Sequence, residues 1–262
     1  MDAVTGVFRS KETGEQAVRD LQSSGIHADK ITLLTPGKDI REEVETIPAE
    51  STEQPGMGKA IGALIGGAAG LSGGLVLAVI PGVGMVSAIG LLGAAILTAA
   101  GASVGAAAGE KAENSMTHGL PEDEIFVYED ALRKGRSVVV VLADDESRAE
   151  AVRKKLHEDG AEAVDAAREQ WWIGLRGAEN EHYSKSGREF RDDEKFYRMG
   201  FEAALHARTR CMEFDQVASE MASDVEELKK KYPDAAVEEP FTRGYERGRD
   251  YYQRMCNQSK AA

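Results

Sequence analysis

Hydrophobic residues near the amino terminus form two short runs that flank a stretch with helical spacing. Residues 4–8 predict a strand, and residues 31–34 predict a second strand that ends before a Pro-Gly pair. Ser10 is suited to cap the helix between them, because a serine side chain accepts a hydrogen bond from a free amide of the first turn. Gly25 is suited to end that helix. This part of the chain therefore predicts a strand-helix-strand unit.

The same order of signals returns in the middle of the chain. Residues 138–142 are four valines and a leucine, which predict a buried strand. Asp144 or Asp145 can cap the next helix, Gly160 can end it, and a short strand is expected at residues 163–164. The second unit thus matches the first in order and in approximate length.

Together the two units predict an α+β domain, a split βαβ sandwich of ferredoxin-like type with four strands. Its first half comprises residues 1–37 and its second half residues 111–170, with a helix expected within residues 121–134. Residues 38–57 are rich in Glu, Thr and Pro and predict a flexible linker.

An uncharged segment interrupts this domain. Residues 60–109 are fifty consecutive positions without a charged side chain, and Pro81-Gly82-Val83-Gly84 is the main break within them. The arms on either side, residues 60–80 and 85–108, each have the roughly 20 residues that a helix needs to cross a hydrocarbon layer about 30 Å thick. We therefore expect a Gly/Ala-rich helical hairpin over residues 58–110.

Glycines in this segment recur at every fourth position. Such spacing places them on one helix face, where missing side chains let two helix backbones approach closely. The predicted helix-packing interface of this glycine zipper consists of Gly62, Gly66, Gly70, Gly74, Gly101, Gly105 and Gly109.

The uncharged hairpin allows three interpretations. The favoured one is insertion into a lipid bilayer, where backbone hydrogen bonding makes a helix nearly obligatory. The alternatives are a soluble assembly that buries the same faces between subunits, and a protected pair of core helices. In the first case a two-arm hairpin returns the chain to its starting side, so both soluble parts would face the cytoplasm at the cytoplasmic membrane. In the second case we expect a cytoplasmic assembly. Both cases predict a homo-oligomer.

Residues 171–262 predict a separate, all-helical module, because their apolar positions recur at intervals of three and four. It begins at Trp171-Trp172, which we expect to pack. A short repeat lies within it, since residues 197–202 and 241–246 share the pattern aromatic-x-x-Gly-aromatic-Glu. A glycine inside a helix costs about 1 kcal/mol relative to alanine, so Gly200 and Gly244 indicate a close approach between helices.

Charge and composition narrow the possible chemistry. The 262 residues carry a formal net charge of −13, which argues against a nucleic-acid partner. The two cysteines lie far apart, and the start of the chain lacks the pattern of a cleaved signal peptide, which favours a reducing compartment. Glu179 and His182 form a single E-x-x-H, too few ligands for a di-iron site. A metal-storage protein or an enzyme that uses this motif is therefore the least favoured alternative. We expect no enzyme, no cofactor and no metal.

Residues 3–168 resemble the heat-induced general stress protein domain family. The similarity rests on the strand-helix runs at residues 4–34 and 135–142 and on the glycine-zipper insert between them. The tail, with its two aromatic-glycine motifs, is similar to a helical module found beside such domains in bacterial stress proteins. The resemblance implies a stress response and membrane association, and it brings no catalytic residues.

Overall fold

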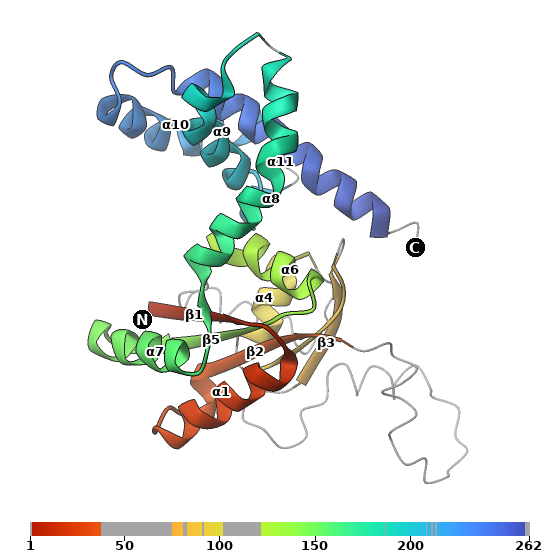
Figure 1. Ribbon diagram of the computed structural model, residues 1–262, viewed down its shortest axis with the longest axis vertical. Helices are drawn as coiled ribbons and strands as arrows, with labels where there is room; N and C mark the ends of the chain where they lie inside the picture. The colour runs from red at the N-terminus through yellow and green to blue at the C-terminus, as the bar shows by residue number, and fades with distance from the viewer. Residues whose placement is uncertain are drawn as a thin grey trace. The chain divides into compact units, whose positions relative to one another are not determined.

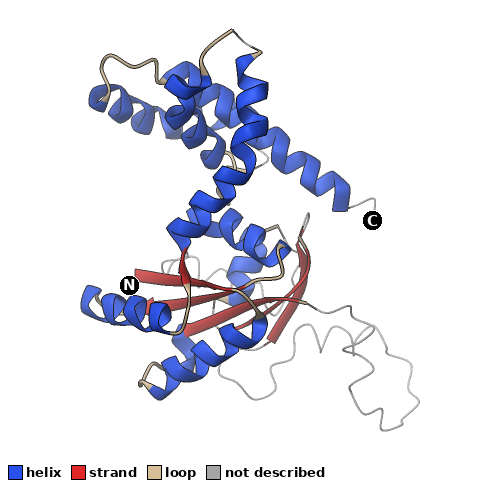
Figure 2. Cartoon of the chain, in the orientation of Figure 1, coloured by secondary structure: helices blue, strands red, loops and turns tan. Residues whose placement is uncertain are grey.

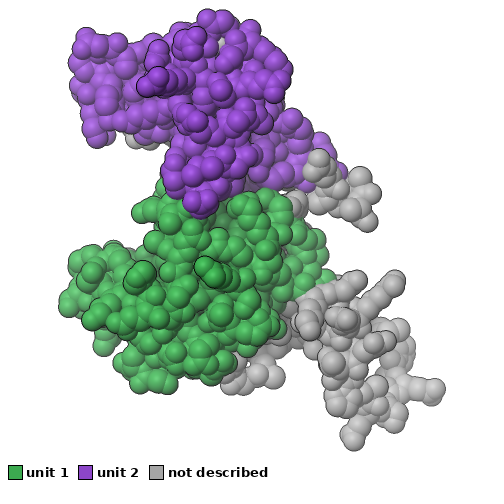
Figure 3. Space-filling view, in the orientation of Figure 1, with its two compact units in different colours: residues 1–168 green, residues 169–262 purple. Residues whose placement is uncertain are grey.

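The computed structural model divides the chain into two units, residues 1–168 and 169–262 (Figure 3). It describes residues 2–37, 75–80, 83–90, 92–101, 122–185, 187–207, 209–210, 212 and 214–259. The second unit begins two residues before Trp171, where the sequence places the start of the helical module.

The first unit contains six strands and the helices between them among its described residues (Figure 2). In chain order they are β1 Asp2–Phe8, α1 Lys11–Ser23, η1 Ala28–Lys30, β2 Ile31–Pro36, β3 Leu75–Ile80, β4 Gly84–Ile89, α4 Gly93–Ala99, η2 Glu122–Glu124, α6 Ile125–Arg133, β5 Ser137–Ala143, α7 Glu146–Glu158 and β6 Glu162–Ala163. The predicted order of both strand-helix-strand units is confirmed.

Local sequence signals set the ends of α1 and α7. The Ser10 hydroxyl accepts a hydrogen bond from the Thr13 amide, and Thr13 Oγ1 accepts one from the Ser10 amide, which completes a capping box. At α7 the cap is Asp145, whose carboxylate accepts from the Arg148 amide at 2.8 Å. Gly25 and Gly160 follow the two helices with φ of 92° and 86°, a conformation that favours glycine.

The strands form one antiparallel sheet in the order β3-β4-β2-β5-β1-β6. Helices α1 and α7 cover one face, and α4 and α6 cover the other (Figure 1). The core under α1 and α7 joins apolar residues of both helices with those of the three central strands. Its main members are Val4, Phe8, Ala17, Leu21, Ile31, Leu33, Val139, Val141, Ala149, Val152 and Leu156.

The helical hairpin expected over residues 58–110 is wrong for residues 75–80 and 84–89, which form the strands β3 and β4. The physical reason is tertiary. β2 offers an unpaired edge, and β4 pairs with it, so the backbone groups of this segment are satisfied by a sheet instead of by a helix. Leu75–Ile80 also has the β-branched and aliphatic residues that suit a strand. The expected four-stranded sheet is therefore six-stranded.

The second unit is helical in its described part, as predicted. It comprises most of α8 Val164–Ser184, together with α9 Phe190–Ala203, α10 Phe214–Lys231 and α11 Glu238–Ser259. The expected strand at residues 163–164 is present only as Glu162–Ala163, because α8 already begins at Val164. Trp171 and Trp172 are both buried, which confirms their packing role.

The two aromatic-glycine motifs pack against each other across α9 and α11. A Cβ atom on Gly200 would collide with the carbonyl of Phe241, and one on Gly244 would collide with the carbonyl of Tyr197. Each glycine therefore meets the first aromatic residue of the other motif. The predicted close approach between helices is confirmed.

Candidate self-association surface

The uncharged segment enters the sheet through β4. Thr35 of β2 lies opposite Ser87 of β4, and their hydroxyl oxygens are 2.6 Å apart in the sheet interior. Both residues are buried. A buried hydroxyl pair is costly unless it is satisfied, so this hydrogen bond favours one register between β2 and β4.

A turn at Gly90 then brings the chain back over the sheet. Gly90 has a φ of 124°, and a side chain there would collide with the backbone of Ile31 and Thr32. The Leu92 amide donates to Thr32 Oγ1 at 3.1 Å, which ties the start of α4 to β2. Ile96 is 2% exposed, so this part of the uncharged segment is core of the first unit.

β3 lies at the end of the strand order and presents an apolar surface. Ala78 and Ile80 point to the face covered by α4, and they are 6% and 1% exposed. Val79 lies between them and points to the opposite face, because side chains alternate along a strand. Its exposed fraction is 57%, the largest among the exposed large hydrophobic residues of the described chain.

The two ends of the sheet differ in how well they are protected. β6 has only two residues, and Glu162 within it pairs with Arg136. β3 has six residues, with no charge, proline or glycine, and within the described chain it pairs with β4 alone. Short length and charged residues are the usual protection of an edge strand against pairing with another chain. The β3 edge, defined as the side of Leu75–Ile80 away from β4, has neither.

Most of the predicted glycine interface stays a prediction. Gly62, Gly66, Gly70, Gly74, Gly105 and Gly109 lie outside the described residues. Gly101 follows α4 with a φ of 82°, so it lies past the end of a helix and not on a helix face. Sequence reasoning missed the β3 edge, although the run of β-branched and aliphatic residues in 75–80, without glycine or proline, was a signal for it.

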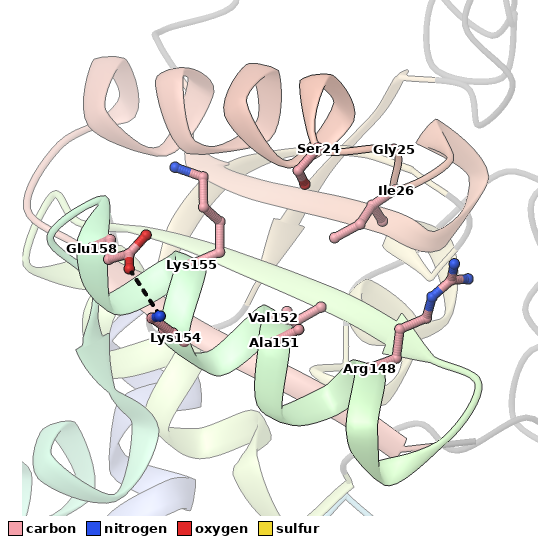
Figure 4. Close-up of a pocket in the computed structure, with 9 residues that line it drawn as sticks. All are labelled: Ser24, Gly25, Ile26, Arg148, Ala151, Val152, Lys154, Lys155 and Glu158. Atoms are coloured by element: carbon pink, nitrogen blue, oxygen red, sulfur yellow. Dashed lines mark ion pairs between the residues drawn. The ribbon is translucent and has the colours of Figure 1, made fainter.

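A groove of ≈ 340 Å³ lies between the end of α1 and the helix α7 (Figure 4). Ile26 and Val152 contribute apolar surface, and three cationic side chains of α7 stand around it. Each of these cations has an internal carboxylate partner: Arg148 pairs with Asp144, Lys154 with Glu158 and Lys155 with Asp159. With its charges compensated inside the protein, the groove has weak means of selecting a charged ligand.

A partly buried polar cluster connects β1 to α6. The Tyr128 hydroxyl donates to Glu124 Oε2, and Thr5 Oγ1 lies 2.8 Å from the Tyr128 oxygen and 3.1 Å from Glu124 Oε2. Burial raises the pKa of the Glu124 carboxyl above its ordinary value. Burial, and then the negative charge of Glu124, raise the pKa of Tyr128 well above its ordinary value. The sequence alone gave no signal for this cluster.

The E-x-x-H motif of the second unit serves an ion pair. Arg247 donates to both carboxylate oxygens of Glu179, at 2.8 and 3.0 Å, and the Tyr197 hydroxyl donates to one of them at 2.8 Å. Glu179 is 2% exposed. His182 lines a pocket of ≈ 280 Å³ beside this pair. No group of three or more potential metal ligands is present among the described residues.

Within the described chain, no helix is both long enough and apolar enough to cross a bilayer. The chain matches no family model, no curated protein and no solved structure.

Proposed function

We propose that this chain is a non-enzymatic, self-associating protein of the bacterial stress-protein type, and that the uncharged segment 60–109 is its association element. One observation carries the proposal. The described part of that segment folds into the first unit and leaves a six-residue, charge-free strand at the edge of the sheet, with Val79 exposed.

Electrostatics favours association through this segment. The net charge of −13 makes two copies repel each other at most approaches. Residues 60–109 contribute nothing to that repulsion, because they carry no ionisable side chain. Apolar surface that is removed from water there gains free energy without a cost for desolvating charges.

The arrangement of the first unit supports the family assignment. The strands β2-β5-β1-β6 are antiparallel neighbours in that order, and α1 and α7 connect β1 to β2 and β5 to β6. We infer from this order that the four strands form the core of a ferredoxin-like split βαβ domain, with β3 and β4 added next to β2. We therefore infer a stress-protein domain whose insert extends the sheet.

Membrane association is the second candidate, favoured by the fifty uncharged residues. The strands β3 and β4 limit how this segment could insert into a bilayer. Only 15 residues, 60–74, precede β3, and as a helix they would span roughly 22 Å, short of a hydrocarbon layer of about 30 Å. After β4, the helix α4 has seven residues. Insertion of two full-length helical arms would therefore require β3 and β4 to leave the sheet.

The test is the mass of the purified full-length chain in solution, measured by size exclusion with light scattering at several concentrations. We expect a dimer or larger oligomer that persists without detergent. A monomer at all micromolar concentrations would contradict self-association. Carbonate and detergent extraction of the native cell fraction separates the two candidates, since only an integral membrane protein resists carbonate and is released by detergent.

A further inference from the structure

We propose that β3 pairs with β3 of a second copy, antiparallel and about a two-fold axis, so that two sheets join into one continuous sheet. This inference rests on the proposed self-association and names its surface. The observation behind it is the β3 edge, which has no charge and pairs with no further strand among the described residues, at the opposite end of the sheet from β6.

Hydrogen bonding supplies the attraction. In an antiparallel ladder successive residues direct their N–H and C=O groups alternately to the two sides, so about half of the groups of Leu75–Ile80 point away from β4. A second strand satisfies these groups with the same geometry that β4 uses on the other side.

Symmetry selects a closed contact. When the same strand meets itself about a two-fold axis, the two strands run antiparallel, and every contact occurs twice: where residue i of one copy contacts residue j of the other, residue j of the first contacts residue i of the second. The contact uses the β3 edge of both copies and leaves no unpaired β3 edge for a third copy. Such pairing gives a finite dimer and not an open fibre.

The composition of β3 selects a second copy over a charged partner. Leu75–Ile80 combines high strand propensity with no charge and no proline, the composition typical of segments that pair with themselves. An acidic or basic peptide would find no opposite charge along this edge. The second copy brings an equally apolar strand, which carries no charge that would oppose the pairing.

Val79→Lys is the primary test, because a lysine on an edge strand is a natural means of blocking such pairing. Val79 is 57% exposed, so the substitution spares the core of the first unit. The matched control is Ile173→Lys, at a 54% exposed position of α8. We expect Val79→Lys to weaken self-association by roughly tenfold or more, and Ile173→Lys to leave it unchanged, with thermal unfolding of both variants close to that of the wild type.

Proline substitution gives a second readout. Of the neighbouring residues Ala78 and Val79, one directs its N–H toward β4 and the other directs it away. Proline has no N–H. At the position whose N–H points toward β4, proline therefore breaks a hydrogen bond between β3 and β4 and lowers the melting temperature. At the position whose N–H points away from β4, proline keeps the fold, and we expect it to abolish the dimer.

The outcomes separate the two proposals. A monomeric wild type would overturn self-association and with it the pairing of β3. An oligomer that survives both Val79→Lys and the fold-preserving proline would overturn β3 pairing alone and leave association through another part of the uncharged segment.

Discussion

Gly200 of α9 and Gly244 of α11 let the two helices cross with their backbones in contact. Each lies against the carbonyl of the aromatic residue that opens the other motif, Phe241 for Gly200 and Tyr197 for Gly244. The contact is reciprocal, and therefore the repeated motif has one structural explanation. Neither glycine can accept a side chain without separating the helices.

Gly200→Ala and Gly244→Ala should each destabilise the second unit by about 2 kcal/mol or more, because the added methyl overpacks a backbone contact. Gly177→Ala in α8 is the control. A Cβ atom added at Gly177 would have open space around it out to 4 Å, so alanine should raise stability by up to about 1 kcal/mol through its higher helix propensity. Urea unfolding followed by circular dichroism measures both effects. Equal changes in the free energy of unfolding for Gly200→Ala and Gly177→Ala would contradict the close backbone contact between α9 and α11.

Glu179→Ala should cost about 3 kcal/mol or more, since it leaves the Arg247 guanidinium without its buried partner. The double variant Glu179→Leu/Arg247→Met should cost much less than the sum of the single changes, because it removes both charges together. Glu181→Gln, at an exposed position of the same helix, should leave the free energy of unfolding unchanged. Additive losses in the double variant would show that the pair is not coupled.

Glu194 makes the stability of the second unit depend on pH in the acid range. Hydrogen bonds from Arg176 at 2.7 Å, followed by one from Trp172, lower the pKa of Glu194 below its ordinary 4.5. A folded-state pKa below the unfolded one gives stability that is present above pH 4.5 and is lost as pH falls through the folded value. Glu194→Gln should therefore be less stable than wild type near pH 7 and equal to it in acid. A constant difference at all pH values would contradict this.

Glu124 should act in the opposite sense. Burial raises its pKa, so the folded state binds the proton more tightly than the unfolded state. The resulting stability is complete below the unfolded pKa and is lost as pH rises through the folded value. Glu124→Gln keeps an oxygen for Tyr128 and Thr5 but carries no charge, so it should stabilise the first unit near pH 7 and have little effect in acid. Thermal melts across the pH range measure this, and a destabilised variant at pH 7 would count against it.

Several features follow from the sequence because they depend on near neighbours in the chain. The capping box of Ser10 and the cap by Asp145 involve residues three positions apart, and Gly25 and Gly160 end their helices through their own backbone freedom. The glycine of each aromatic motif by itself indicates close helix packing, because a glycine inside a helix is otherwise unfavourable.

Only the tertiary structure decided what the uncharged segment becomes. Residues 75–89 are apolar, without charge, and their glycine and alanine neighbours are compatible with a membrane helix, so local composition could not exclude that outcome. The unpaired edge of β2 decided it, because pairing with β4 satisfies backbone groups that a helix would satisfy internally. In the same way Glu179 was placed in a potential metal motif by its spacing to His182, whereas α11, 68 residues later, supplied Arg247 as its partner. A contact between residues that are distant in the sequence cannot be predicted from their neighbours in the chain, because it forms and contributes free energy only when the chain folds.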